Sequence, residues 1–271
     1  MKEEKVRKAV RQRYGKIAKT KTASCGYGCA SPTSGASISE QIGYSKNELN
    51  SVPNEVDLNL GCGNPVALAS LKEGETVIDL GSGGGLDCFL AAKKVGPTGK
   101  VIGVDMTAEM LERERANCKK GGYKNVEIRL GEIENLPVAD NTANIIISNC
   151  VINLSPNKQR VFQEVYRVLK PKGRLMISDM VLLGEIPEKV KNSVLAYVGC
   201  IAGAENKGDY LSKIKQAGFQ QIEVVKEEHL PEMMLDDSDI QDTIGKLKLT
   251  KQETTKIAKQ IVSIKVSAIK P

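Results

Sequence analysis

The chain has few of the residues on which several common enzyme and binding-protein chemistries depend. It contains no tryptophan, three phenylalanines and a single histidine, His229, among 271 residues. One histidine excludes a multi-histidine metal site and argues against a Ser-His-Asp triad, whose base is a histidine. Aromatic residues make up only 4% of the chain. This scarcity argues against a function in which the protein binds nucleic acid by stacking bases on aromatic side chains.

Long apolar runs are also missing from the sequence. No stretch approaches the roughly 20 residues that cross a bilayer, and the charged segment 1–14 lacks the apolar centre of a signal peptide. We therefore expect a cytoplasmic protein without membrane contact, whose seven cysteines are reduced. Their odd number and irregular spacing argue against a disulfide framework.

The net charge of +6 does not indicate a nucleic-acid surface. The lysines are dispersed and lie beside acids, as Lys119 and Lys120 lie near Glu112 and Glu114. A nucleic-acid footprint would gather basic residues on one face. Hydrophobic residues make up 41% of the chain and charged residues 27%, which is typical of a globular fold with a sizeable core.

Short apolar strands alternate with helices through most of the chain. Strands are predicted at 76–80, 100–104, 126–130, 144–148, 174–179, 220–226 and 261–269. Helices are predicted between them at 86–95, 107–121, 158–169, 188–203 and 207–218. This alternation indicates a parallel sheet covered on both faces. We expect an N-terminal helix and cysteine-bearing cap loop (1–65), an α/β core (66–230), and a helical insert with a last strand (231–271).

A glycine-rich turn follows the first predicted strand. The segment 81–85, Gly-Ser-Gly-Gly-Gly, leads directly into a helix, and such glycines let the backbone approach a ligand closely. The dinucleotide fingerprint G-x-G-x-x-G is not met, because its sixth position holds Leu86. The turn therefore favours a nucleotide-type site other than an NAD site.

Three acidic residues stand at the ends of predicted strands beside this turn. Asp79 precedes the turn, Asp105 ends the second strand and Glu132 follows the third. Ligands of parallel α/β sheets bind at the carboxyl ends of the strands, where a carboxylate can hold the hydroxyls of a ribose. One such acid could simply cap a turn, but the set favours a nucleotide-like ligand.

On these motifs the chain resembles the class I methyltransferases that use S-adenosylmethionine (SAM). The resemblance implies a Rossmann-like α/β fold with a seven-stranded, mostly parallel sheet and helices on both faces. It also implies cofactor contacts from the glycine loop and the neighbouring strand ends. The residues at the matching positions are Asp79, Gly81, Ser82, Gly83, Asp105, Met106, Glu132, Ile133 and Asn149.

Three cysteines from separate segments are predicted to meet above the sheet. Cys62 lies in a Gly-Cys-Gly turn that favours an exposed thiol, Cys150 follows the fourth strand, and Cys200 lies on a helix after the fifth. Thiolates bind soft centres, and three sulfurs in a trigonal pyramid suit trivalent arsenic. The arsenic lone pair would then point away from the sulfurs and could attack the SAM methyl group without a general base.

Packing and zinc binding are alternatives for these cysteines. Free cysteine is among the most buried residue types, and Cys88 is expected to pack in the core, whereas Cys118 shows no role. A zinc site could combine the same three cysteines with Cys25 or Cys29. Structural zinc normally takes closely spaced pairs, and only Cys25 and Cys29 resemble that spacing.

The resemblance becomes closer in the cysteine-bearing segments. Leu60-Gly-Cys-Gly-Asn-Pro65, Ser148-Asn-Cys-Val-Ile-Asn-Leu-Ser155 and Gly199-Cys-Ile-Ala-Gly-Ala204 are similar to segments of compact prokaryotic arsenite methyltransferases. This implies SAM-dependent methylation of arsenite or its thiol conjugates by a monomer, with the arsenic bound by Cys62, Cys150 and Cys200.

The family resemblance also implies a fourth cysteine near the N-terminus. In the family this cysteine pairs with the equivalent of Cys62 when arsenic is oxidised, and thioredoxin or glutathione reduces the pair. Relatives often carry adjacent cysteines there, whereas this chain has Ser24-Cys-Gly-Tyr-Gly-Cys29. Cys25 is the expected partner of Cys62, and Cys29 is the alternative.

Two other functions fit the sequence less well. Methylation of another small molecule, such as a quinone or a sterol, normally needs a general base, and the sequence offers only scattered carboxylates. An arsenic-responsive binding or sensor protein would have no use for Asp79, Asp105 and Glu132 at the strand ends.

Overall fold

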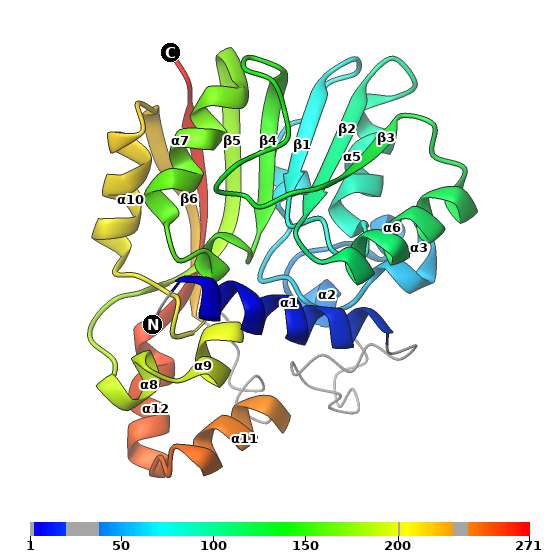
Figure 1. The fold of residues 1–271 in the computed structure, drawn as a ribbon. Coiled ribbons are helices and arrows are strands. Elements are labelled where there is room, and N and C mark those ends of the chain that lie inside the picture. Colours follow the sequence, from blue (N-terminus) through cyan, green and yellow to red (C-terminus); the bar gives the residue numbers. More distant parts are fainter. Residues whose placement is uncertain (1–2, 20–37, 200, 230–237) are drawn as a thin grey trace.

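One mixed sheet forms the centre of the protein (Figure 1). The computed structural model describes residues 3–19, 38–199, 201–229 and 238–271. Its seven strands have the order β3-β2-β1-β4-β5-β7-β6. β7 runs antiparallel to β5 and β6, whereas the other neighbouring strands are parallel. The predicted Rossmann-like methyltransferase fold is therefore confirmed.

The strands follow the apolar segments of the sequence. They are β1 (Thr76–Leu80), β2 (Lys100–Asp105), β3 (Val126–Leu130), β4 (Ala143–Asn149), β5 (Leu169–Leu182), β6 (Gln220–His229) and β7 (Ile261–Ile269). In β4, Ile145, Ile146 and Ile147 are all fully buried. Such a continuous run indicates a strand with both faces covered, because successive side chains point to opposite faces of a sheet.

Helices cover both faces of this sheet. The helices of the sheet layers are α4 (Pro65–Leu68), α5 (Leu86–Val95), α6 (Ala108–Gly121), α7 (Lys158–Val168) and α10 (Lys207–Gln216). Side chains of α4 and α5 pack in one core cluster, with Cys118 of α6 against it, and those of α7 and α10 pack in another. Ile78 and Leu80 of β1 contribute to the second cluster and Val77 to the first, as the alternation of a strand requires.

The remaining helices lie toward the carboxyl ends of the parallel strands (Figure 1). They are α1 (Glu3–Lys19), α2 (Ile38–Gln41), α3 (Lys46–Asn50), the short 3₁₀ helices η1 (Asn54–Val56) and η2 (Ile152–Leu154), α8 (Glu188–Lys191), α9 (Val194–Val198), α11 (Ser238–Lys246) and α12 (Lys251–Gln260). None of the helices in the described ranges is long and apolar enough to cross a membrane.

The helix predicted at 188–203 is interrupted, which corrects the sequence-based expectation. The backbone N–H of Asn192 closes α8 by donating to the carbonyl of Glu188. The hydroxyl of Ser193 then accepts a hydrogen bond from the backbone of Ala196, 3.3 Å away, and begins α9. Serine favours such N-cap positions, so two short helices replace one.

A carboxyl group is buried in β5, just past the residue that pairs with the end of β4. Asp179 of β5 is fully buried and accepts hydrogen bonds from the Tyr210 hydroxyl at 3.0 Å and from the Met180 backbone at 2.9 Å. Burial raises the pKa of Asp179 to about 7. Since the ordinary aspartate pKa is about 3.9, Asp179 binds its proton more tightly in the folded chain than in the unfolded chain.

Asp179→Asn should change how stability depends on pH. The stabilisation from the Asp179 proton is present below about pH 4 and is lost as pH rises toward about pH 7. Asparagine stays neutral, so the free energy of unfolding of the variant relative to wild type should rise over this window. The rise should be up to about 1.4 kcal/mol per pH unit. Urea unfolding at several pH values measures it, and a constant difference would contradict the assignment.

Candidate active site

A cavity opens at the carboxyl edge of the sheet, between the strand ends and α1. Its lining comes from the glycine loop after β1, from the ends of β2 and β4, from the segment after β3, and from 56–61 and α1. Eight predicted cofactor contacts line it: Asp79, Gly81, Ser82, Gly83, Asp105, Met106, Ile133 and Asn149. The structure thus brings together all but one of the predicted set.

Glu132 is the exception, because its side chain turns to α1. The Glu132 carboxylate lies 3.4 Å from Arg7 Nε and 3.2 Å from Arg11 Nη1. Glu134 lines the cavity instead, where it accepts a hydrogen bond of 2.7 Å from the Ser155 hydroxyl. Glu132 therefore holds α1 across the sheet edge, and this geometry does not support a cofactor contact from its side chain.

The glycine loop needs glycine for two separate reasons. Gly81, Gly83 and Gly85 all have φ between +55° and +96°, a region that other residues rarely adopt. A side chain at Gly81 would collide with Val151, whereas a Cβ at Gly83 would meet only the Gly81 carbonyl, 3.9 Å away. The backbone at Gly83 therefore faces open space in the cavity. Its N–H donates to Asp105 Oδ2 at 3.1 Å, which fixes the loop against β2.

The cavity is strongly acidic. The carboxyl groups that line it are Asp57, Asp79, Asp87, Asp105 and Glu134, and Arg7 of α1 also lines it. Burial raises the pKa of Asp79 well above its usual value, and the charges of Asp87 and Glu114 raise it further. Burial also raises the pKa of Asp87 to about 6. A cation in the cavity would relieve this crowding of negative charge.

A buried polar network supports the glycine loop from below. The Ser82 hydroxyl donates to Glu114 Oε2 at 2.6 Å, and the Cys88 thiol donates to Asp79 Oδ2 at 3.3 Å. Burial raises the pKa of Glu114 to about 7. Cys88 is fully buried, as predicted, and burial raises the pKa of its thiol well above the usual value. A neutral thiol is a poor nucleophile and metal ligand, so Cys88 is a packing residue.

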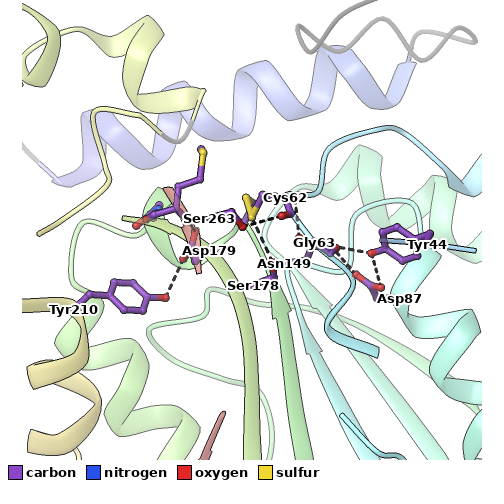
Figure 2. The surroundings of a disulfide bond; sticks show 12 residues. Tyr44, Cys62, Gly63, Asp87, Asn149, Ser178, Asp179, Tyr210 and Ser263 are labelled. Atoms are coloured by element: carbon purple, nitrogen blue, oxygen red, sulfur yellow. Dashed lines mark hydrogen bonds between the residues drawn. A yellow bond between two sulfur atoms is a disulfide. The ribbon is translucent and has the colours of Figure 1, made fainter. Parts of the chain in front are cut away.

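Cys62 and Cys150 meet beside this cavity. Figure 2 shows the surroundings of Cys62. A disulfide joins their sulfurs, and their Cα atoms are 5.9 Å apart. This differs from the expectation that every cysteine is a free thiol. Cys62 is also only 8% exposed, which corrects the prediction that its Gly-Cys-Gly turn presents the thiol to solvent. Cys150 lines the cavity.

The glycines on either side of Cys62 allow close packing against the sheet. A Cβ at Gly61 would lie 2.6 Å from Asn149 Nδ2, and a Cβ at Gly63 would collide with Ser178 Oγ and lie 2.9 Å from Lys265 Cε. A side chain at either position would therefore displace these neighbours. The turn is therefore packed against the end of β4 and against Ser178 of β5 and Lys265 of β7, which explains why Cys62 is buried.

Asn149 joins the Cys62 turn to the cavity (Figure 2). Its Oδ1 accepts a hydrogen bond from the Cys62 backbone N–H at 3.0 Å, and its Nδ2 donates to the Gly63 carbonyl at 2.7 Å. The same Nδ2 lies 2.9 Å from the Tyr44 hydroxyl and 3.2 Å from Asp87 Oδ2. Asn149, which is a predicted cofactor contact, thus also holds the cysteine segment through hydrogen bonds.

Cys150 has an unusual backbone conformation. Its φ is +57°, and a non-glycine residue in this left-handed region costs about 1–3 kcal/mol. The Cys150 N–H donates to the Ser178 carbonyl at 2.8 Å, which helps to hold the conformation. Strain of this kind gathers at functional sites, where the surrounding structure maintains it.

Of the remaining cysteines, Cys88 and Cys118 lie in the described parts of the chain. Cys25, Cys29 and Cys200 lie outside the described residues, although Ile201 packs against the same hydrophobic cluster as Cys62 and Cys150. The thiol of Cys118 on α6 donates to the Tyr123 carbonyl at 3.5 Å. Within the described ranges, no three His, Cys, Asp or Glu side chains are grouped to hold a metal ion.

Sequence reasoning missed several residues of this site. Asp87 carries a detectable signal, because it stands in the first turn of the helix that follows the glycine loop. Tyr44, which donates to Asp87 at 2.8 Å, lies in Ile42-Gly-Tyr-Ser45, a segment to which the sequence assigned no site role. Ser178 and Ser263 lie in strands whose apolar pattern indicated only a core role.

Comparison with known proteins agrees with this geometry. A family model described as a methyltransferase domain matches residues 71–218. An arsenite methyltransferase of Halobacterium salinarum is 48% identical over 242 residues, which is 86% of this chain and 62% of that protein. An arsenite methyltransferase of Aquipseudomonas alcaligenes is 37% identical over 192 residues, 68% of this chain and 54% of that protein.

A solved structure extends the comparison to three dimensions. The arsenic(III) SAM methyltransferase of Chlamydomonas reinhardtii superposes with a TM-score of 0.61 at 30% identity, over 86% of this chain and 73% of that chain. The present chain spans 62% and 54% of the length of the two curated relatives. On the family model and these similarities, the chain belongs to the arsenite methyltransferase family of SAM-dependent methyltransferases.

Proposed function

We propose that the protein transfers the methyl group of SAM to trivalent arsenic held by cysteine thiolates. The observation that carries this proposal is the meeting of Cys62 and Cys150 at the edge of the cavity, from positions 88 residues apart. Because Cys150 itself lines the cavity, an arsenic atom on its sulfur would face the bound cofactor. The family relationship supports the same reaction.

The cavity suits SAM in charge, and its glycine loop leaves room for a ligand. SAM carries a sulfonium and an ammonium group against one carboxylate, so it is a net cation, and the acidic lining complements it. Asp105 lies where a carboxylate can hold the ribose hydroxyls, and the open space at Gly83 admits a ligand against the backbone. Bound SAM supplies an activated methyl group. The protein positions the acceptor and excludes competing nucleophiles.

The cysteines provide the acceptor. Cys62, Cys150 and, by our proposal, Cys200 bind arsenite or its thiol conjugates through sulfur, which suits a soft centre. The arsenic lone pair then points away from the sulfurs and is the nucleophile, so no base is needed. The Cys62–Cys150 disulfide must first accept two electrons and two protons, which thioredoxin or glutathione can supply. Cys25 remains the proposed redox partner of Cys62.

Cys150→Ser should abolish methylation and leave cofactor binding in place. A lost arsenic ligand misplaces the acceptor, so the rate of methylation should fall by about a hundredfold or more. Calorimetry should give a SAM affinity within about threefold of wild type, since the change is one atom. Arsenic speciation after incubation with SAM, arsenite and glutathione measures the reaction.

The matched control for this substitution is Cys118→Ser. Cys118 lies on α6 with its thiol donating to the Tyr123 carbonyl, so the control should methylate arsenite at the wild-type rate. Undiminished arsenic methylation by Cys150→Ser would refute the proposed site. Full activity on a quinone or sterol acceptor, with none on arsenite, would refute the proposed substrate.

Asp105→Asn should weaken SAM binding. Asp105 Oδ1 and Oδ2 accept from the Thr107 and Gly83 backbones. Loss of the charge would weaken both the loop and the ribose contact, lowering affinity by about 10- to 100-fold. Asp209→Asn, at an exposed position on α10, is the control. If both variants bind SAM as wild type does by calorimetry, Asp105 does not contact the cofactor.

A further inference from the structure

Two serine hydroxyls lie next to Cys62 (Figure 2). Ser178 Oγ of β5 is 3.7 Å from Cys62 Sγ, and Ser263 Oγ of β7 donates to the Cys62 carbonyl at 2.9 Å. Ser178 is fully buried and Ser263 is 6% exposed. Buried hydroxyls are normally hydrogen-bonded, and both of these use Cys62 as a partner.

Ser178 contacts both cysteines of the pair. A sulfur in a disulfide carries no hydrogen, so the Ser178 hydroxyl is the donor in its contact with Cys62 Sγ. The Ser178 carbonyl accepts from the Cys150 N–H at 2.8 Å. One residue of β5 therefore fixes the Cys62 sulfur and the strained Cys150 backbone relative to each other.

The register of the sheet places the second serine beside the first. β5 and β7 are antiparallel, with Ser178 opposite Lys265 and Met180 opposite Ser263. Residues opposite one another, and residues two apart in a strand, share a face. Ser178 and Ser263 therefore project from the same face of the sheet, diagonally across the strand pair.

We propose that Ser178 and Ser263 are positioning residues of the arsenic site, which hold Cys62 within reach of Cys150. This inference rests on the proposed function. Cys62 stands between two glycines, and glycine gives a backbone more freedom than any other residue. The two hydroxyls, together with Asn149, restrict that freedom. When both cysteines are thiolates, these contacts keep their sulfurs close enough to bind one arsenic atom together.

The first test needs no arsenic. Equilibration with glutathione converts two protein thiols and one glutathione disulfide into the Cys62–Cys150 disulfide and two reduced glutathiones. The equilibrium constant reports the effective concentration of the two thiols. Ser178→Ala and Ser263→Ala should each lower it about fivefold, as expected for one lost hydrogen bond. Mass spectrometry of alkylated samples identifies the pair.

Ser267→Ala is the matched control, because Ser267 lies on the same face of β7, four residues along the strand. It should leave the equilibrium constant unchanged. Ser263→Thr keeps the hydroxyl and should restore most of the wild-type value. The proposal is overturned if the two alanine variants have the same equilibrium constant as Ser267→Ala. It is also overturned if Ser263→Thr has no higher equilibrium constant than Ser263→Ala, because the serines would then have only a structural role.

The second test uses the proposed reaction. In Ser263→Ala the KM for arsenite should rise about fivefold while the KM for SAM stays unchanged. A merely structural defect would move both constants, and this outcome would overturn the inference. If wild type does not methylate arsenite but the glutathione equilibrium shifts as expected, the proposed function fails and the positioning role of the serines stands.

Discussion

The rest of the site depends on the hydrogen bonds that the Asn149 side chain makes. This residue ends β4 and binds both the N–H of Cys62 and the carbonyl of Gly63, in a segment that precedes β1. The same amide reaches Asp87 in the cavity wall. Because one rigid group makes all these contacts, the cysteine pair and the cofactor cavity cannot shift independently. A charge-assisted bond such as that to Asp87 is also stronger than a neutral one.

Much of the cavity could be predicted because its residues depend on local pattern and on one topological rule. The isoleucines of β4 and the valine and isoleucine of β1 mark buried strands without any knowledge of their partners. Parallel strands end at a common edge, so Asp79 and Asp105 had to approach one another once the strands were recognised. The left-handed turns at Gly81 and Gly83 likewise follow from the residue type itself.

Contacts between distant segments could not be predicted in this way. Gly61 and Gly63 suggested an exposed turn, because glycine permits flexibility, yet here it permits close approach by Asn149 and Ser178. The sequence alone does not distinguish flexibility from close packing at a glycine, because the difference depends on which residue lies against it. Glu132 shows the same limit on a smaller scale. Its position after β3 was identified correctly, but whether its carboxylate faces the cavity or α1 depends on Arg7 and Arg11.

The site also depends on β7, the last strand in the chain. β7 lies between β5 and β6, and Ser263 on it contacts Cys62, 201 positions earlier in the chain. In an unfolded chain with the disulfide reduced, nothing would keep the Cys62 and Cys150 sulfurs together, since closing a loop over their separation of 88 positions costs entropy. A ligand that binds two or three of these sulfurs therefore binds the folded state in preference. By linkage, its binding free energy stabilises the sheet that assembles it.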